Sequence, residues 1–312
     1  MRKFRIIFLL SVGLLFICDR SLSYLFDYFY QHTKTGQSGG KINYYLSLEK
    51  TPEWVVMGNS RALYQIIPDS FPATTYNLCH AGMHQIFQTG LLTQMANEGK
   101  MPKLILLHIE PEEFIGEQFN RDIQNLKYYH SKNEWITNEL NALSPYEPTK
   151  FFFASYRYNG RVISLMKNYL QTRRTDYNSN GYMVIEPSET DSITTMYSLQ
   201  QAQPPSNEKL NLQQWNYLRA FIDRCQKEKT QVICFTSPVY SYSYRATAGV
   251  LELEKNLEKM GVPYINYLQK NIPALQQRAS FWKDRHHLNH AGAQIESSVL
   301  QHDVDSLLRQ PL

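Results

Sequence analysis

The sequence predicts an α/β protein: a flavodoxin-like, doubly wound parallel sheet of about five strands, with a helical and loop insertion and an N-terminal membrane-anchor helix. Three observations predict it. Short apolar runs, each closed by Gly, Pro or a polar residue, alternate with segments of helical spacing. A stretch rich in Tyr, Asn, Gln and Ser interrupts this alternation, and an apolar segment begins the chain. Strands that alternate with helices form a parallel sheet covered on both faces.

The N-terminal segment has the charge pattern of an exported chain. Residues 4–18 are uncharged apart from Arg5 and mostly apolar, they follow Arg2-Lys3, and the run ends at Asp19. Positive residues before an apolar segment hold the N-terminus in the cytoplasm. A cleavage site needs small residues, and the residues before Asp19 are bulky, which favours an uncleaved anchor over residues 1–26. We therefore expect a membrane-anchored, extracytoplasmic protein of the cell envelope; a cleaved signal peptide and a buried helix of a cytosolic protein are the alternatives.

The composition excludes several classes of partner and site. The chain is 43% hydrophobic and 19% charged, as in ordinary globular proteins, and its net charge of +4 comes with no Lys/Arg-rich block. Nucleic acid is therefore not an expected partner. The four cysteines form no CxxC pair, so neither zinc-ribbon nor thioredoxin chemistry is indicated. No metal and no cofactor is expected.

The strand and helix signals lie on both sides of the interruption. Residues 27–50, which are rich in glycine near their middle, are interpreted as a linker. The α/β domain takes residues 51–116 and 211–312, and residues 117–210 form the insertion. The expected strands are residues 53–57, 75–78, 104–109, 232–235 and 262–268. The expected helices of the α/β domain are residues 62–67, 85–98, 212–227, 249–260 and 290–308.

Each element has a local reason. The first strand is a short apolar run that ends at Gly58, and Pro68 stops the short helix after it. The second helix has apolar residues at helical spacing and ends at Gly99, and the third strand lies between two prolines. The helix before Gly261 carries the mixed charges of a solvated face. The last helix is amphipathic, and Asn289 is placed to cap it.

Polar residues or glycines follow all of the expected strands. In strand order they are Ser60, Gly82, Glu110, Ser237 and the loop 284–287. The carboxyl ends of parallel strands meet at one edge of the sheet, where doubly wound folds bind their ligands. We therefore expect these residues to converge.

Ser60, His287 and Asp284 are the residue types that nucleophilic catalysis needs. A histidine can take the proton of a serine hydroxyl and return it to a leaving group. An Asp three residues before the histidine can fix the tautomer of the ring and stabilise its cation. The backbone N–H groups of Ser60 and Gly82 are candidate donors to the oxyanion.

These motifs also have structural interpretations. A Gly-Asn-Ser run after a strand can be a turn with a helix cap, and an Asp three residues before a His can be local capping. Ser237 is a rival nucleophile, but the proline after it removes a backbone donor. A metal site is a further alternative, although it leaves Ser60 unexplained. Its ligands would be Asp284, His286, His287 and His290.

Three short motifs resemble the blocks of the SGNH (GDSL-like) hydrolase superfamily. They are Gly58-Asn59-Ser60-Arg61, Tyr76-Asn77-Leu78 with Gly82, and His287-Leu288-Asn289 with Gly292. The similarity covers residues 51–116 and 211–300. It is strongest with the envelope-associated acyltransferase and esterase branch, which includes the alginate O-acetylation proteins and the teichoic acid D-alanine transfer protein. The resemblance implies that Ser60, His287 and Asp284 are catalytic and that Gly82, Asn59 and Arg61 support the oxyanion.

The chain departs from the family pattern in its third block. The family carries an Asn there whose side chain donates to the oxyanion, but the strand exit reads His108-Ile109-Glu110-Pro111. A carboxylate cannot donate that bond unless it is protonated. Losing one oxyanion donor costs on the order of 10²–10³ in rate. Weak hydrolysis, another donor such as Arg61, or a transferase role therefore stay open.

The expected function is a membrane-anchored serine esterase or O-acyltransferase that acts on acyl groups of an envelope or exported polysaccharide. Its expected partners are the membrane, an acylated polysaccharide or other ester substrate and, if transfer is the role, a membrane-bound protein that donates the acyl group. The alternative is a catalytically silent protein of the same fold that binds a glycan or a partner in an envelope assembly.

Overall fold

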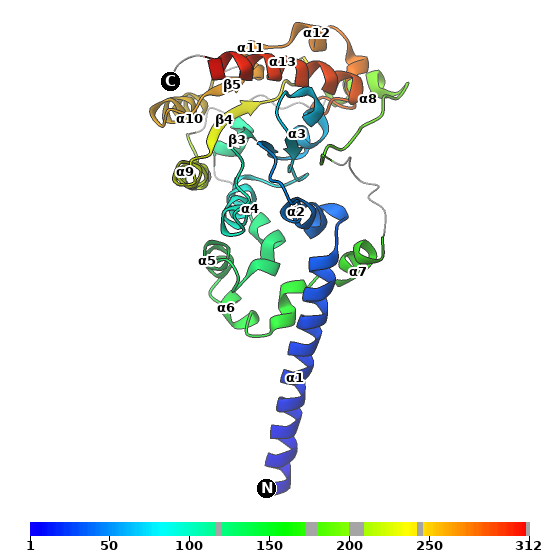
Figure 1. The fold of residues 1–312 in the computed structure, drawn as a ribbon, viewed down its shortest axis with the longest axis vertical. Coiled ribbons are helices and arrows are strands. Elements are labelled where there is room, and N and C mark those ends of the chain that lie inside the picture. Colours follow the sequence, from blue (N-terminus) through cyan, green and yellow to red (C-terminus); the bar gives the residue numbers. More distant parts are fainter. Residues whose placement is uncertain (117–119, 172–179, 200–208, 242–245, 310–312) are drawn as a thin grey trace. The chain divides into compact units, whose positions relative to one another are not determined.

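The computed structural model describes residues 1–116, 120–171, 180–199, 209–241 and 246–309 (Figure 1). The chain divides into two compact units. Unit 1 is residues 1–47 and 121–174, and unit 2 is residues 48–120 and 175–312. The sequence predicted one insertion over residues 117–210, whereas the structure assigns residues 121–174 to unit 1 and the rest of this range to unit 2.

Unit 2 contains a fully parallel five-stranded sheet in the order β2-β1-β3-β4-β5. Its register places Val55 beside both Tyr76 and Ile105. The strands are β1 (Trp54–Met57), β2 (Thr75–Asn77), β3 (Leu104–His108), β4 (Gln231–Thr236) and β5 (Tyr264–Asn266). The central strands are buried because helices cover both faces, so the prediction of a flavodoxin-like, doubly wound sheet is confirmed.

The helices of unit 2 pack in two layers. On one face α4 (Gln85–Asn97) packs against α9 (Leu212–Lys227), and on the other α3 (Ser60–Gln65) packs against α13 (His290–Arg309) (Figure 1). The core beneath α3 and α13 includes Val56, Leu106, Ile233, Trp282 and Leu300. The remaining helices of unit 2 are α8 (Asp191–Leu199), α10 (Ala248–Lys259), α11 (Tyr267–Lys270) and α12 (Pro273–Gln276), with 3₁₀ turns η2 (Pro68–Ser70), η3 (Pro111–Phe114) and η6 (Ala279–Phe281).

The last strand is shorter than its apolar pattern predicted. Residues 262–268 were expected to be extended, but β5 ends at Asn266 and the chain enters α11. The Asn266 side chain accepts a hydrogen bond from the N–H of Leu268, at 3.0 Å, and so caps the new helix. A cap of this kind stops a strand in favour of a helix even where the following residues are apolar.

Unit 1 is helical and is built around the first helix. Its elements are α1 (Arg2–His32), the π-helical turn η1 (Gly36–Gly40), α2 (Lys41–Leu46), the 3₁₀ segments η4 (Asp122–Tyr129) and η5 (Ala154–Tyr158), α5 (Glu134–Ala142), α6 (Glu147–Lys150) and α7 (Val162–Leu170). Tyr30 stacks on Tyr128, with ring centroids 3.7 Å apart. Residues 27–50, interpreted as a linker, are therefore largely helical, because aromatic packing holds the end of α1 and the turn after it.

Helix α1 is long and apolar enough to cross a membrane, by length and composition. It spans 31 residues, and its first half exposes almost all of its large apolar side chains. Within the described residues, it is the one helix with these properties.

Candidate active site

Ser60 is the first residue of α3, directly after the exit of β1. The backbone at Gly58 has φ 148°, and a Cβ there would lie 2.6 Å from Cβ of His108. Only glycine lets β1 pass the end of β3 this closely. The side chain of Asn59 then accepts a hydrogen bond from the N–H of Arg61, at 3.0 Å, and caps α3. The turn leaves the Ser60 side chain half-buried at the carboxyl edge of the sheet.

The structure brings together the three residues predicted to be catalytic. Ser60 Oγ lies 3.0 Å from Nε2 of His287. On the other side of the imidazole ring, Nδ1 lies 2.9 Å from Oδ2 of Asp284. The order hydroxyl, imidazole, carboxylate is the one in which a histidine can accept the serine proton while the carboxylate orients the ring.

Asp284 is ionised over the whole neutral range. Burial alone would raise the pKa of its carboxyl group, but hydrogen bonds from the ring and backbone of His287 and the backbone of His286 lower this pKa to about 2. The two backbone N–H groups donate to Oδ1 at 2.7 and 2.9 Å. These bonds hold the carboxylate in place behind the imidazole.

The loop that carries His287 is fastened on both sides. The residues after the histidine, Leu288 and Asn289, are fully buried, and the Asn289 side chain donates to Ser280 O at 2.7 Å. At Gly292 a Cβ would lie 2.5 Å from Phe281 O, so α13 and η6 approach too closely for any side chain there. Leu288, Asn289 and Gly292 therefore support the site by fixing the loop.

A residue that sequence reasoning missed also supports this loop. Asp191, at the start of α8, is fully buried and accepts hydrogen bonds from Asn289 Nδ2 at 2.9 Å and Lys283 Nζ at 3.3 Å. It lies in the polar stretch that was interpreted as an insertion. Its partners Lys283 and Asn289 lie 92 and 98 residues later in the chain, and no local sequence pattern links residues so far apart.

Two backbone N–H groups remain candidates for oxyanion donors. Ser60 begins α3, and Gly82 has φ 69° in the turn after β2. Neither N–H donates a hydrogen bond within the described part of the chain. The two strand exits are tied together, since His80 N donates to Gly58 O at 2.9 Å. The N–H of Ser60 also has the favourable field of a helix start.

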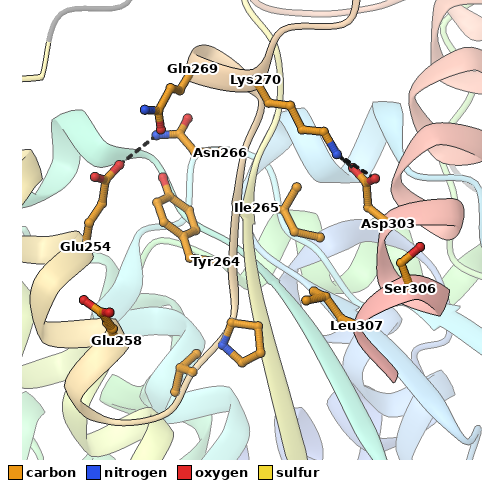
Figure 2. Close-up of a pocket in the computed structure, with 12 residues that line it drawn as sticks. Glu254, Glu258, Tyr264, Ile265, Asn266, Gln269, Lys270, Asp303, Ser306 and Leu307 are labelled. Carbon is orange, nitrogen blue, oxygen red and sulfur yellow. Dashed lines mark hydrogen bonds and ion pairs between the residues drawn. The ribbon is translucent and has the colours of Figure 1, made fainter. Parts of the chain in front are cut away.

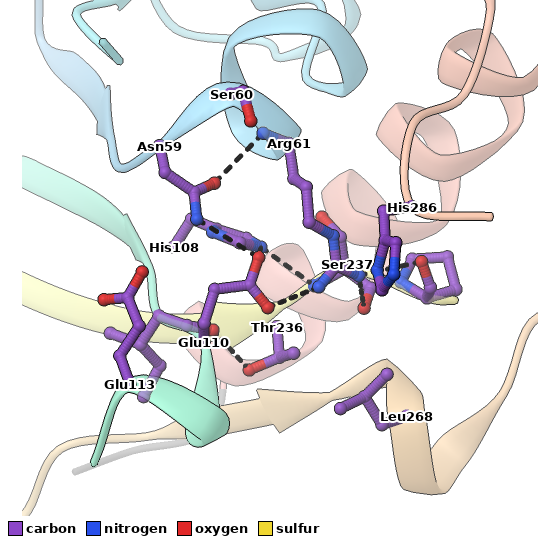
Figure 3. Close-up of polar contacts among 12 residues, drawn as sticks. Asn59, Ser60, Arg61, His108, Glu110, Glu113, Thr236, Ser237, Leu268 and His286 are labelled. Carbon is purple, nitrogen blue, oxygen red and sulfur yellow. Dashed lines mark hydrogen bonds and ion pairs between the residues drawn. The ribbon is translucent and has the colours of Figure 1, made fainter. Parts of the chain in front are cut away.

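Asn59 and Arg61, predicted as oxyanion supports, both bind Glu110 (Figure 3). Asn59 Nδ2 donates to Oε1 of Glu110 at 3.2 Å, and the buried guanidinium of Arg61 forms an ion pair with Oε2. Arg61 also donates to the carbonyls of Ser237 and Pro238. The two side chains thus connect the exits of β1, β3 and β4 behind the serine.

Glu110 lies at the exit of β3, where the resemblance predicted an oxyanion donor. Burial would raise the pKa of this carboxyl group, but the charge of Arg61 and the hydrogen bond from the Asn59 amide hold the pKa below its usual value. The group is therefore an ionised acceptor at neutral pH. His108 behind it is neutral, since burial lowers the pKa of its ring to about 3, and its Nε2 accepts from Ser237 N at 3.2 Å.

The sequence raised two alternatives, Ser237 as the nucleophile and a metal site that includes His290, and both groups lie in other environments. Ser237 is fully buried behind Arg61, away from solvent. His290 Nδ1 lies 3.0 Å from the hydroxyl of Tyr182. In the described residues no group of three or more His, Cys, Asp or Glu side chains is arranged to hold a metal ion.

A hollow of about 630 Å³ lies at another edge of the sheet, beside β5 (Figure 2). Its lining comes from α10, β5, α11 and α13, and it contains the ion pair between Lys270 and Asp303. None of Ser60, Asp284 and His287 lines it. This hollow is therefore separate from the candidate active site, despite its size.

Comparison with known proteins gives structural likeness only. No family model matches the chain, and no curated protein matches it. Among solved structures the chain is similar to a putative acylhydrolase from Bacteroides fragilis, at 10% identity and a TM-score of 0.39, over 82% of this chain and 88% of the other. It is also similar to a GDSL-like lipase from Bacteroides thetaiotaomicron, at 10% identity and a TM-score of 0.39, over 84% and 92% of the two chains. At this level of similarity, the activity of those proteins cannot be assigned to this one.

Proposed function

We propose that the protein is a serine esterase or O-acyltransferase of the SGNH type, anchored in a membrane by α1. The observation that carries the proposal is the relay from Ser60 Oγ through the His287 ring to Asp284, with contacts of 3.0 and 2.9 Å. A capping turn explains Asn59 but gives no reason for an imidazole to approach the serine from a loop 227 residues away.

The proposed reaction has two half-reactions. Ser60 Oγ attacks an ester carbonyl while His287 Nε2 takes its proton, and the N–H groups of Ser60 and Gly82 stabilise the oxyanion. When the tetrahedral intermediate collapses, the ester C–O bond breaks and His287 protonates the departing alkoxide. His287 then takes a proton from water or from a sugar hydroxyl, which attacks the acyl-serine, and as the acyl–Oγ bond breaks His287 gives this proton to Ser60 Oγ.

The proposed place of action is the extracytoplasmic face of a membrane. Basic residues precede the apolar part of α1, which favours a cytoplasmic N-terminus, so the rest of the chain follows on the other side. The proposed substrate is an acylated envelope or exported polysaccharide, with a membrane-bound protein as acyl donor if the reaction is a transfer. Substrate and donor are proposed on the resemblance of the motifs alone.

Covalent labelling of the full-length protein in detergent tests this function. A fluorophosphonate should modify the wild type, and Ser60→Ala and His287→Ala should abolish or strongly slow the modification. Ser237→Ala is the matched control, because it removes the rival hydroxyl, and it should label as the wild type does. Labelling that survives in Ser60→Ala would remove Ser60 from the mechanism.

A catalytically silent binding protein is the second candidate, favoured by the ionised Glu110 in the place of a donor. Absence of labelling in a folded wild-type protein, together with no release of acetate from p-nitrophenyl acetate or from an acetylated polysaccharide, would favour that candidate. Acetate release that needs both Ser60 and His287 would reject it.

A further inference from the structure

Unit 1 exposes large apolar side chains beyond the first 18 residues of α1. Leu22, Phe152 and Phe153 are each about half exposed or more. They come from α1 and from the segment between α6 and η5, which lies beside α1 in Figure 1, at the end of unit 1 where the first half of the helix leaves it. An exposed group of large apolar residues on a soluble surface marks an interaction site.

Specific contacts fasten this segment to α1 at the residue where the apolar run ends. The Asp19 carboxylate accepts hydrogen bonds from Ala154 N at 2.9 Å, Ser155 N at 3.0 Å and Ser155 Oγ at 2.6 Å. Arg20 Nη2 donates to Phe152 O at 2.9 Å. These bonds bury the Asp19 side chain, so that its charge is shielded from its surroundings.

The apolar run of α1 is short for a bilayer. Residues 4–18 are 15 positions, about 22 Å of helix at roughly 1.5 Å per residue, whereas the hydrocarbon core is about 30 Å thick. A membrane around this run would therefore reach past Asp19, to the level of Leu22 and of the segment fastened there. At that level the lipid would meet the side chains of Phe152 and Phe153.

A groove lies beside α1 at this level. Its volume is about 580 Å³, and its apolar lining includes Leu22, Phe26, Phe153 and Val162. Lys150 also lines it, with a side chain that is 45% exposed and an ammonium group that is ion-paired with Glu147 at 2.7 Å. The lining combines a surface for an acyl chain with a cation for a phosphate group.

The distribution of charge between the two units also favours a membrane contact of unit 1. Unit 1 contains 15 Lys and Arg against 6 Asp and Glu, or 12 against 6 without the three at the N-terminal end of α1, while unit 2 contains 17 against 22. The basic unit is thus the one that carries the anchor helix and the exposed aromatic residues. Excess basic charge next to a membrane-spanning helix favours anionic headgroups.

We propose that this face of unit 1, made by Leu22, Phe26, Phe152, Phe153 and Val162 and called here the aromatic shoulder, lies in the interface of the bilayer that α1 crosses and holds an acyl chain of an anionic phospholipid in its groove. The inference rests on the proposed membrane insertion of α1. Leu22 and Phe26 belong to α1 itself, whose first half exposes its large apolar side chains. Aromatic rings at headgroup level are typical of membrane anchors.

Spin-label depth measurement on the full-length protein tests the proposal. The protein is reconstituted in phosphatidylcholine–phosphatidylglycerol bilayers with Cys18→Ser as background, since Cys79, Cys225 and Cys234 are buried. Single nitroxides are placed by Leu10→Cys in the anchor and Phe153→Cys in the shoulder. The matched control is Leu251→Cys on α10 of unit 2, because Leu251 is 53% exposed and Phe153 54%. Accessibility to oxygen and to a water-soluble nickel chelate is measured for each.

The label at Phe153 should be at least several-fold more accessible to oxygen, relative to the nickel chelate, than the label at Leu251. Phe152→Cys should give the same result at an independent position. Water-like accessibility at both shoulder positions, with a lipid-embedded label at Leu10, would overturn the inference and leave the anchor standing. A water-like label at Leu10 would overturn the anchor and the inference together.

Discussion

The carboxylate of Glu110 is ion-paired with the buried guanidinium of Arg61, directly behind the serine that begins α3. This pair lies at the exit of β3, where the resemblance of the sequence motifs predicted an oxyanion donor. It also ties the exits of β1, β3 and β4 together through the carbonyls of Ser237 and Pro238. The pair therefore fixes the strand exits around the candidate site, and an ionised Glu110 cannot donate to an oxyanion.

Glu110→Gln should destabilise the protein strongly. The change keeps the shape of the side chain but leaves the buried Arg61 charge without its partner, which costs about 3–5 kcal/mol of unfolding free energy. Denaturant unfolding of the full-length protein in detergent measures it. The control is Glu53→Gln, which removes the exposed pair with Lys103 and should change stability little. Equal stability of Glu110→Gln and wild type would show that the pair is not structurally important.

Asp284→Asn should slow modification of Ser60 by a factor on the order of 10³–10⁴ while the protein stays folded. The amide keeps an oxygen for the N–H groups of the loop, but it no longer orients the neutral imidazole or stabilises its cation. The rate of fluorophosphonate labelling measures the effect. Asp303→Asn breaks an ion pair with Lys270 beside β5 and should label at the wild-type rate. A similar rate in Asp284→Asn and wild type would contradict the relay.

Glu296 should make the protein less stable as the pH rises from about 5 to about 8. This residue of α13 is fully buried, and burial raises the pKa of its carboxyl group to about 8, against the opposing effects of Ser237 and Arg61. Between the unfolded pKa, about 4.3, and the folded value, the folded chain holds a proton that the unfolded chain has lost, so stability falls as pH rises.

Glu296→Gln should remove that slope and raise the unfolding free energy at pH 8 by a few kcal/mol, on the order expected for a pKa shift of this size. Unfolding is measured at several pH values between 5 and 8. Glu258→Gln, on the exposed face of α10, is the control and should keep the wild-type slope. If Glu296→Gln kept the same slope, the proton would be bound elsewhere.

Gly58→Ala should disturb the site more than its size suggests. The new Cβ would lie 2.6 Å from His108 Cβ, at a φ of 148° that side chains rarely adopt, so the turn before Ser60 must shift. We expect labelling at least tenfold slower, because a displacement of the nucleophile by about 1 Å is costly. The control is Gly99→Ala, at φ 63° with open space around it. This change costs only the backbone strain of about 1 kcal/mol, and the variant should be labelled at the wild-type rate.

Local rules in the sequence account for most of the sheet and for the polar residues at its edge. Apolar runs closed by Gly58 or by prolines predicted the strands, and the parallel arrangement followed from the alternation with helices. The meeting of Ser60 with His287 followed in turn, since both come after strands of one parallel sheet. The buried Glu296 had a sequence signal that was overlooked, because it lies on the apolar face of α13 four residues before Leu300.

Other features depended on pairings that no local pattern encodes. The sequence by itself determined the order of strands and helices, the apolar N-terminal helix and the identity of the residues at the strand exits. Only the tertiary structure decided that Arg61 binds Glu110, that Asp191 holds the histidine loop, and that residues 121–171 belong to the same compact unit as the first helix. The reason is physical. Strand, helix and cap preferences act over a few residues, whereas a buried charge or an aromatic ring takes its partner from whatever segment the packed chain brings beside it.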